Sequence, residues 1–286
     1  MNAPEEKTVI FYVGDASLLG VVHPAHGPAQ SEGVLIVVGG PQYRVGSHRQ
    51  FVITARALAR RGYDVFRFDY RGMGDSSGSH AGFERCGEDI RAAIDVFFAQ
   101  CPHLRGVHLF GLCDGASAAL MYAPQDSRVL GLILANPWVR TESSQAETYL
   151  RHYYLKRLFQ PDFWRKLLKG GLDVRKSFGS LADNLQRSRG AGATGSARAA
   201  TSYVVRMREA LGDFSGRVML LLSGDDLTAR EFVDLYGRDK QWIDVAKRAQ
   251  VLRRDLPDAD HTFSKRSTLD RANALCADWL QGRMSR

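Results

Sequence analysis

The chain has 286 residues, of which 44% are hydrophobic and 24% charged, a composition ordinary for a globular protein with a substantial core. No apolar stretch approaches the roughly 18–20 residues of a membrane span, and the N-terminus lacks the apolar run of a secretory signal, so we expect a cytoplasmic protein. The 4 cysteines form no CxxC pair and no zinc-type cluster, so a disulfide framework, a metal and a cofactor are not expected.

Short apolar runs bounded by turn residues alternate along the chain with helical patterns. The predicted strands are 8–13, 18–23, 33–38, 63–69, 107–110, 129–134, 217–222 and 250–255, and the predicted helices are 48–61, 83–100, 114–123, 229–247 and 267–281. A short turn around Gly14 predicts a hairpin for the first two strands, and helices separate the later ones. This order predicts an α/β protein with the α/β-hydrolase fold, an eight-stranded, mostly parallel sheet flanked by helices.

One interval interrupts the alternation after the sixth strand. Residues 138–212 show helical patterns and no clear strand, which predicts a helical cap inserted into a core of residues 1–137 and 213–286. Within the cap, the Gly/Ala-rich run 190–196 predicts a flexible segment.

The cap carries the net charge of the chain. Residues 139–212 hold 14 Lys or Arg against 6 Asp or Glu, and the rest of the chain is balanced. This excess favours an anionic small-molecule substrate, or a lipid- or sugar-linked acyl substrate, and it also suits peripheral contact with a membrane. A packed cap with a solvated basic face is the structural alternative, and no nucleic-acid-binding module is present.

The most informative segment surrounds Cys113. A predicted strand runs into Gly111-Leu112-Cys113-Asp114-Gly115 and then into a helix rich in small residues, the pattern of a nucleophile elbow. The helix N-terminus favours a thiolate, while Asp114 places a negative charge beside the sulfur. A buried structural cysteine is the alternative for the bare motif, and the strand–turn–helix context favours catalysis. The other three cysteines are predicted to be small core residues.

Acyl transfer through a nucleophile needs a base and a group that orients the base. His261 follows the last predicted strand and is the candidate base. Asp226 follows the preceding strand and is the preferred acid, with Asp225 as the fallback. Each aspartate alone is as typical of a turn or a helix N-cap, but the order nucleophile, acid, histidine is that of this fold.

The predicted oxyanion hole uses backbone amides. One donor is the N–H of Asp114, the residue after the nucleophile. The other comes from the loop that follows the third strand, where Pro41 has no N–H; Gln42 is favoured and Gly40 is the alternative.

Four segments of this chain resemble the exosortase A system-associated hydrolases of the type-1 branch. They are residues 39–51, 68–78, 111–115 and 136–140, and the Gly-Gly-Pro-Gln-Tyr-Arg block at 39–44 is the most specific. The resemblance implies an α/β-hydrolase-fold protein from bacterial exopolysaccharide and protein-sorting loci. The cysteine in place of serine also resembles dienelactone hydrolases, which hydrolyse, and polyhydroxyalkanoate synthases, which transfer acyl groups.

The sequence therefore favours a hydrolase, an esterase or thioesterase, that works through an acyl-Cys113 intermediate. An acyltransferase with the same triad is the first alternative, because the cysteine does not choose between water and another acceptor. A non-catalytic scaffold of the export machinery that binds through the basic cap is the second alternative.

Overall fold

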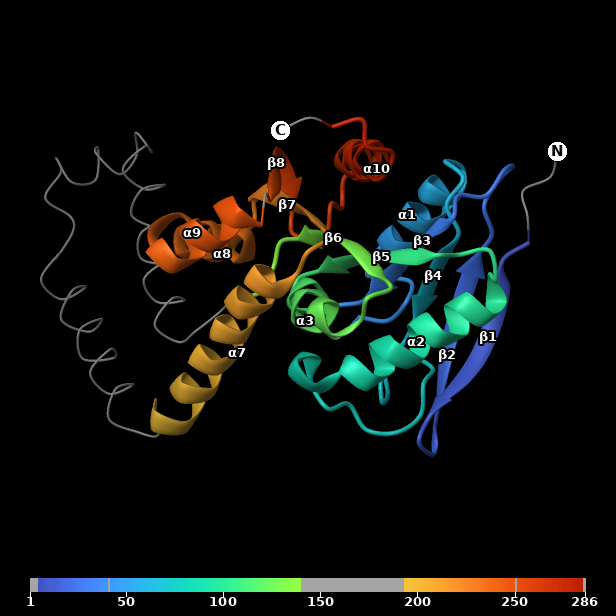
Figure 1. Ribbon diagram of the computed structural model, residues 1–286, viewed down its shortest axis with the longest axis horizontal. Helices are drawn as coiled ribbons and strands as arrows, with labels where there is room; N and C mark the ends of the chain where they lie inside the picture. Colours follow the sequence, from blue (N-terminus) through green and yellow to red (C-terminus); the bar gives the residue numbers. More distant parts are fainter. Residues whose placement is uncertain (1–4, 41, 140–192, 250, 285–286) are drawn as a thin grey trace, which may run out of the picture. The chain divides into compact units, whose positions relative to one another are not determined.

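A single eight-stranded sheet organises the protein (Figure 1). The computed structural model describes residues 5–40, 42–139, 193–249 and 251–284. The strands are β1 (Lys7–Val13), β2 (Ala16–His23), β3 (Glu32–Val37), β4 (Val65–Phe68), β5 (Gly106–Leu112), β6 (Val129–Ala135), β7 (Arg217–Asp225) and β8 (Leu252–Asp260). All eight predicted strands are present.

The order across the sheet is β1-β2-β4-β3-β5-β6-β7-β8. Strand β2 pairs antiparallel with both β1 and β4, and every other pairing is parallel. The predicted α/β-hydrolase fold is confirmed by this order and by the helices that flank the sheet.

The central strands are apolar along their whole length because helices cover both of their faces. In β3, Val34, Leu35 and Ile36 are all fully buried. Val34 and Ile36 belong to a core cluster that includes Phe51 and Leu269, from helices on the same face. This packing fixes the face that each strand presents, and with it the side chains at the strand ends.

The helices are α1 (Gln50–Ala59), α2 (Gly87–Gln100), α3 (Asp114–Tyr122), α7 (Ala193–Asp213), α8 (Leu227–Arg238), α9 (Lys240–Arg248) and α10 (Arg266–Leu280), with short 3-10 helices η1 (Phe83–Arg85) and η2 (Ala123–Gln125). Figure 1 shows α1 and α10 on one face of the sheet and α2 and α3 on the other.

The helix predicted over 229–247 is wrong in one respect, because it is two helices. The carboxylate of Asp239 accepts hydrogen bonds from the backbone N–H groups of Gln241, at 2.8 Å, and Trp242, at 3.3 Å. Asp239 is therefore the N-cap of α9, and its extended backbone ends α8.

The chain divides into two compact units, residues 1–139 with 206–286, and residues 140–205. Most of the predicted cap lies outside the described residues, so its boundaries and its basic surface stay predictions. Helix α7 begins at Ala193 and so includes residues 193–196, the last part of the run expected to be flexible.

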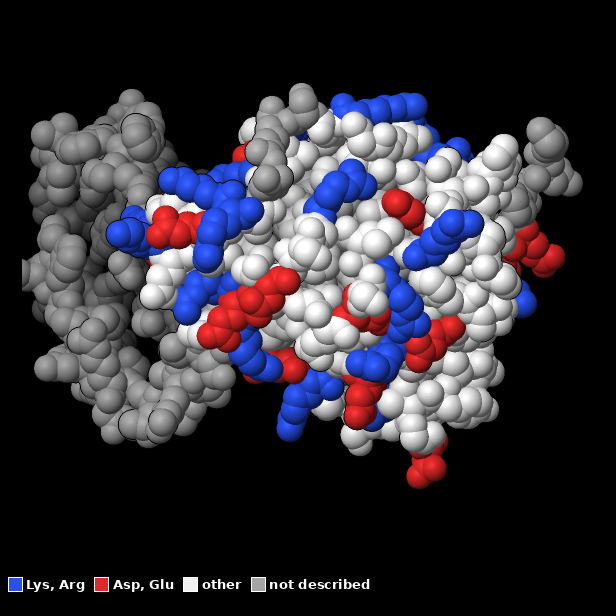
Figure 2. Space-filling view, in the orientation of Figure 1, with Lys and Arg blue, Asp and Glu red and all other residues white. Residues whose placement is uncertain are grey.

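Figure 2 shows acidic and basic side chains interspersed on the visible face, in keeping with the balanced charge outside residues 139–212. Among the helices described, none is long and apolar enough to cross a membrane.

The cysteines separate into two groups, as expected. Cys86, Cys101 and Cys276 are buried and Cys113 is half-buried. Burial raises the pKa of each buried thiol to about 12, which leaves these three groups as neutral core residues.

Candidate active site

The turn that carries Cys113 joins β5 directly to α3. Cys113 has φ 61° and ψ −129°, a strained conformation for a residue with a side chain. Its N–H donates to the carbonyl of Ala135 at 3.0 Å, which ties the turn to the end of β6. This sharp turn places the half-buried thiol just beyond the strand, at the carboxyl edge of the sheet.

Two glycines make this turn possible. A Cβ on Gly111 would lie 2.5 Å from the Cα of Ala116, and one on Gly115 would lie 2.5 Å from the carbonyl oxygen of Val37. Neither position can hold a larger residue without moving the backbone. The spacing G-x-C-x-G is thus explained by close contact of β5, α3 and the end of β3, the geometry of a nucleophile elbow.

The sheet register places the acid beside the base. Asp225, the last residue of β7, is aligned with Asp260, the last residue of β8. The next residue on each strand is Asp226 and His261, and the Nδ1 of His261 lies 2.8 Å from the Oδ2 of Asp226. Asp225 itself is exposed, so the structure brings the preferred acid, and not the fallback, to the histidine.

Asp226 also caps a helix. Its carboxylate accepts hydrogen bonds from the N–H groups of Thr228, at 3.1 Å, and Ala229, at 3.0 Å, at the start of α8. The role of Asp226 as a helix N-cap is therefore compatible with its predicted role as the acid that orients His261. The helix N-terminus stabilises the carboxylate, and the carboxylate orients the imidazole.

His261 connects this carboxylate to the thiol. Burial lowers the pKa of His261, but hydrogen bonds with Asp226 and Cys113, and the electrostatic attraction of both, outweigh burial and raise the pKa to about 10. The imidazole is therefore cationic at neutral pH. The structure brings Cys113, Asp226 and His261 together in the order and at the strand ends expected, and their catalytic roles stay predictions.

Three residues that the sequence analysis did not single out hold the loop of His261. Consecutive backbone carbonyls each accept one side-chain hydrogen bond: residue 260 from the hydroxyl of Ser223 at 2.8 Å, residue 261 from the amide of Asn136 at 2.9 Å, and residue 262 from the Nε2 of His48 at 2.9 Å. Asn136 also bonds Ser223 through both ends of its amide. These donors fix the backbone and leave the imidazole ring free to bind Asp226 and Cys113.

Asn136 was visible in the sequence as part of the block 136–140, but its role was not. Its φ of 46° is in the left-handed region, which asparagine tolerates better than most residues. Since Leu112 is aligned with Ala135, Cys113 and Asn136 emerge from neighbouring strands side by side.

The loop that follows β3 lies against the elbow. A Cβ on Gly39 would lie 2.1 Å from the carbonyl oxygen of Leu112, so the two backbones touch. The N–H of Gly40 donates to the carboxylate of Asp114. Further along the loop, Arg44 donates from its N–H to Asp69 at 2.6 Å and pairs with the same carboxylate through its guanidinium.

The structure leaves the second oxyanion donor as a prediction. The side chain of Gln42 accepts a hydrogen bond from Gln50 at 2.8 Å, which ties the favoured residue to the start of α1. The alternative, Gly40, is the residue whose amide reaches the elbow, through Asp114.

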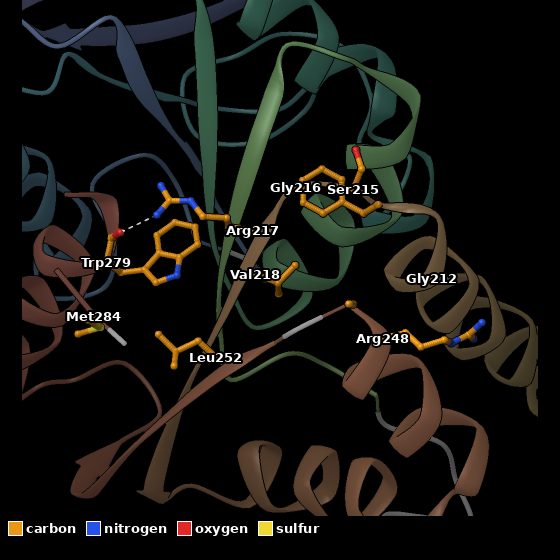
Figure 3. Close-up of a pocket in the computed structure, with 11 residues that line it drawn as sticks. Gly212, Ser215, Gly216, Arg217, Val218, Arg248, Leu252, Trp279 and Met284 are labelled. Atoms are coloured by element: carbon orange, nitrogen blue, oxygen red, sulfur yellow. Dashed lines mark hydrogen bonds between the residues drawn. The ribbon is translucent and has the colours of Figure 1, made fainter. Parts of the chain in front are cut away.

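A cavity of about 540 Å³ lies away from these residues. Figure 3 shows Arg217 and Trp279 on one side of it and Gly212 and Arg248 on the other, with Val218 and Leu252 between. Arg217 and Leu252 are the first residues of β7 and β8, whereas Asp226 and His261 follow the last ones, roughly 25 Å away along the strands. The cavity is therefore no part of the candidate site.

Metal chemistry has no visible ligand set in the described part of the chain. Among those residues, no group of three or more His, Cys, Asp or Glu side chains is placed to hold a metal ion. The reacting groups that the structure does assemble are a thiol, an imidazole and a carboxylate.

Residues 29–227 match the family model described as serine aminopeptidase, S33. The fold is similar to that of an esterase from Pyrococcus furiosus, at 14% identity and a TM-score of 0.65, over 98% of this chain and 91% of that one. It is also similar to a dienelactone hydrolase from Anabaena variabilis, at 16% identity and a TM-score of 0.60, over 98% and 99% of the two chains. A proline iminopeptidase from Mycobacterium smegmatis matches at 15% identity and a TM-score of 0.60, over 96% and 98%. At such identities the likeness shows the fold alone, and no curated protein matches the sequence.

Proposed function

Because the chain belongs to the serine aminopeptidase S33 family of α/β-hydrolases, we propose that it hydrolyses ester or thioester bonds and that Cys113 is its nucleophile. The observation that carries the proposal is the contact of His261 with Asp226 and with Cys113 at the carboxyl edge of the sheet. The description of the matched family names a serine enzyme. A cysteine at the elbow keeps the covalent route and changes the attacking atom from oxygen to sulfur.

The first half-reaction forms an acyl-enzyme. With the cationic His261 beside the sulfur, Cys113 attacks the acyl carbon as a thiolate and sends the carbonyl electron pair to oxygen. The N–H of Asp114, at the start of α3, is one donor for that oxyanion. When the oxyanion collapses, the bond to the leaving group breaks, and the leaving oxygen or sulfur takes the proton of His261.

The second half-reaction releases the acid. His261, now neutral, takes a proton from water as the water oxygen attacks the acyl carbon. The carbon–sulfur bond then breaks, and the thiolate and the imidazolium are restored. Asp226 holds the ring by its Nδ1 throughout.

Intact-mass measurement with p-nitrophenyl esters and acyl-CoAs tests this proposal. We expect an adduct of one acyl group that localises to Cys113, and turnover that is lost in Cys113→Ala. Cys101→Ala is the matched control, because it removes a buried thiol far from the elbow and should keep the adduct. Turnover that persists in Cys113→Ala would refute the cysteine route.

The acceptor is decided by the products. With water as the acceptor, the carboxylic acid accumulates at the same rate with or without added sugars or amines. An ester or amide product that forms only when an acceptor is present would make the protein an acyltransferase with the same triad.

The proposed setting, bacterial exopolysaccharide export, rests on the resemblance of segments 39–51, 68–78, 111–115 and 136–140, of which the block at 39–44 is the most specific. A deletion strain from such a locus, complemented with Cys113→Ala, tests it. Loss of polymer output in the complemented strain would support an enzymatic role in export. Normal output would support a non-catalytic scaffold instead.

A further inference from the structure

The side chain of Asp114 binds the backbone amides around the elbow. Its carboxylate accepts a hydrogen bond from the N–H of Gly40. The nearby backbone amides of Gly115 and of Asp114 itself also favour its charged form and act to lower its pKa. The side chain thus turns back onto the turn from which it starts, and it reaches across to the loop after β3.

Two of these amides are those from which the oxyanion hole of the proposed enzyme would be built. The N–H of Asp114 is the predicted first donor, and the N–H of Gly40 is one of the two candidates for the second. An oxyanion hole binds a negatively charged oxygen on backbone N–H groups, and a carboxylate oxygen is chemically such an oxygen. The carboxylate of Asp114 therefore occupies the N–H of Gly40, a candidate donor that the reaction would need for the substrate oxygen.

Among the residues that the structure describes, Gly39 leaves the carboxylate access to the amide of Gly40. Gly39 has no side chain to shield the elbow, and a Cβ there would lie 2.6 Å from the Oδ1 of Asp114. The N-terminus of α3 adds its own attraction for a negative charge.

The carboxylate is nevertheless held in an unfavourable environment. Burial raises the pKa of Asp114 above its usual range, and the three backbone amides and the nearby His80 only partly oppose that effect. Tyr70 and Cys86 also lie within electrostatic range, and Asp114 raises the pKa of both. A charge that is poorly solvated can be displaced by a ligand that brings its own oxygen to the same donors.

We propose that the Asp114 carboxylate occupies the oxyanion hole of the free enzyme and acts as a specificity-determining group, which a substrate must displace before Cys113 can be acylated. The proposal rests on the acyl-Cys113 chemistry proposed above. A small activated ester has few contacts with which to displace the carboxylate and reacts slowly. A substrate that binds strongly through its other parts displaces the carboxylate and reacts fast.

Asp114→Ala and Asp114→Asn test the proposal through two reactions of the same sulfur. Acylation by p-nitrophenyl acetate, measured in a single turnover, needs the oxyanion hole. Alkylation by iodoacetamide needs only the thiolate, so it corrects for any change that the lost charge makes in the sulfur itself. The readout is the ratio of the acylation rate to the alkylation rate.

We expect Asp114→Ala to raise this ratio by about 10-fold or more, since one oxyanion donor is worth on the order of 10²–10³-fold in rate. Asp114→Asn should give a smaller rise, because the amide oxygen keeps the shape of the carboxylate and loses its charge. If the alanine variant fails to fold, the asparagine variant, which keeps the hydrogen-bond acceptor for Gly40, decides.

Two results would overturn the inference. A ratio that falls in both variants would mean that the carboxylate supports the oxyanion hole. A ratio that stays constant while both rates rise would mean that the carboxylate acts only on the thiolate. Failure of the proposed function looks different: no variant and no wild-type protein would form an acyl-enzyme, although iodoacetamide still labels Cys113.

Discussion

The loop after β8 and the loop after β3 meet the elbow from opposite sides, and they are held by opposite means. Around His261, side chains donate hydrogen bonds to three consecutive carbonyls. Around Gly40, carboxylates accept hydrogen bonds from amides, Asp114 at Gly40 and Asp69 at Arg44.

The difference matters because the reaction uses amides and does not use carbonyls. The donors that bind the carbonyls of the His261 loop fix the position of the base. They do not compete with a substrate, because the proposed reaction needs no carbonyl. A carboxylate that binds the amides of the second loop fixes the backbone and also uses donors that a substrate needs. The loop of His261 is thus already arranged for the proposed reaction. In the loop after β3, the Asp114 carboxylate must first leave the amide of Gly40.

The largest effect expected on the His261 side of the site comes from Asp226→Asn. Asparagine still caps α8, so the helix should be kept, but an amide no longer stabilises the imidazolium of His261 or fixes the ring by its Nδ1. We expect kcat to fall by about 10³–10⁴-fold, with α8 retained by circular dichroism.

Asp239→Ala is the control for that variant. It removes the N-cap of α9, which contacts no catalytic residue, and should lower stability by about 1 kcal/mol while kcat is kept. A loss of less than 10-fold in Asp226→Asn would show that the carboxylate serves the helix and not the base.

An intermediate effect is expected from Asn136→Ala. The variant removes the donor to the His261 carbonyl and both bonds to Ser223, so the histidine loop can shift. A displacement of about 1 Å in a catalytic group is worth on the order of 10²-fold, and we expect that loss in kcat with KM nearly unchanged.

Asn136→Gly separates the hydrogen bonds from the backbone. Glycine accepts the φ of 46° without strain but makes no side-chain bond. If glycine restores kcat, His261 is positioned by the left-handed backbone at position 136. The proposed role of the hydrogen bond from Asn136 to the His261 carbonyl would then be wrong. An NMR titration of His261 in both variants provides a second readout.

A pH dependence of stability is also expected. The folded protein raises the pKa of His261 to about 10 from its usual 6.5, so protonation favours the folded state. The contribution is complete below about pH 6.5 and is lost as the pH rises toward 10. One proton corresponds to a slope of at most about 1.4 kcal/mol per pH unit.

His261→Asn isolates this contribution, because the other groups that titrate in the same range are common to both proteins. Denaturant unfolding at several pH values should show the advantage of the wild type over the variant shrinking between pH 6.5 and 10. An advantage that grows with pH would mean that His261 is buried as a neutral ring.

The sequence predicted the parts of this arrangement that depend on local pattern. Apolar runs bounded by turn residues located all eight strands, and the elbow, the acid and the base followed from motifs at the strand ends. The break at Asp239 was missed, because the apolar periodicity continues through it and only the cap geometry ends α8.

The rest depends on sheet register, which local pattern does not contain. The bond from Asn136 to the carbonyl of His261 joins residues 125 apart, and the bond from Gly40 to Asp114 joins residues 74 apart. The sequence predicted that Asp114 places a negative charge beside the sulfur of Cys113. The contact of Asp114 with the β3 loop requires β3 and β5 to be adjacent, as the strand order makes them.

The backbone of Cys113 has a consequence for how this chain changes under selection. At φ 61° and ψ −129°, glycine would sit without strain, and relief of that strain is worth roughly 1–3 kcal/mol. A library screened only for abundance or heat resistance should therefore enrich glycine at position 113 and discard the nucleophile. If a residue with a side chain persists at position 113 under such a screen, selection for activity outweighs selection for stability there. The residue frequencies at this one position therefore compare the two selective effects.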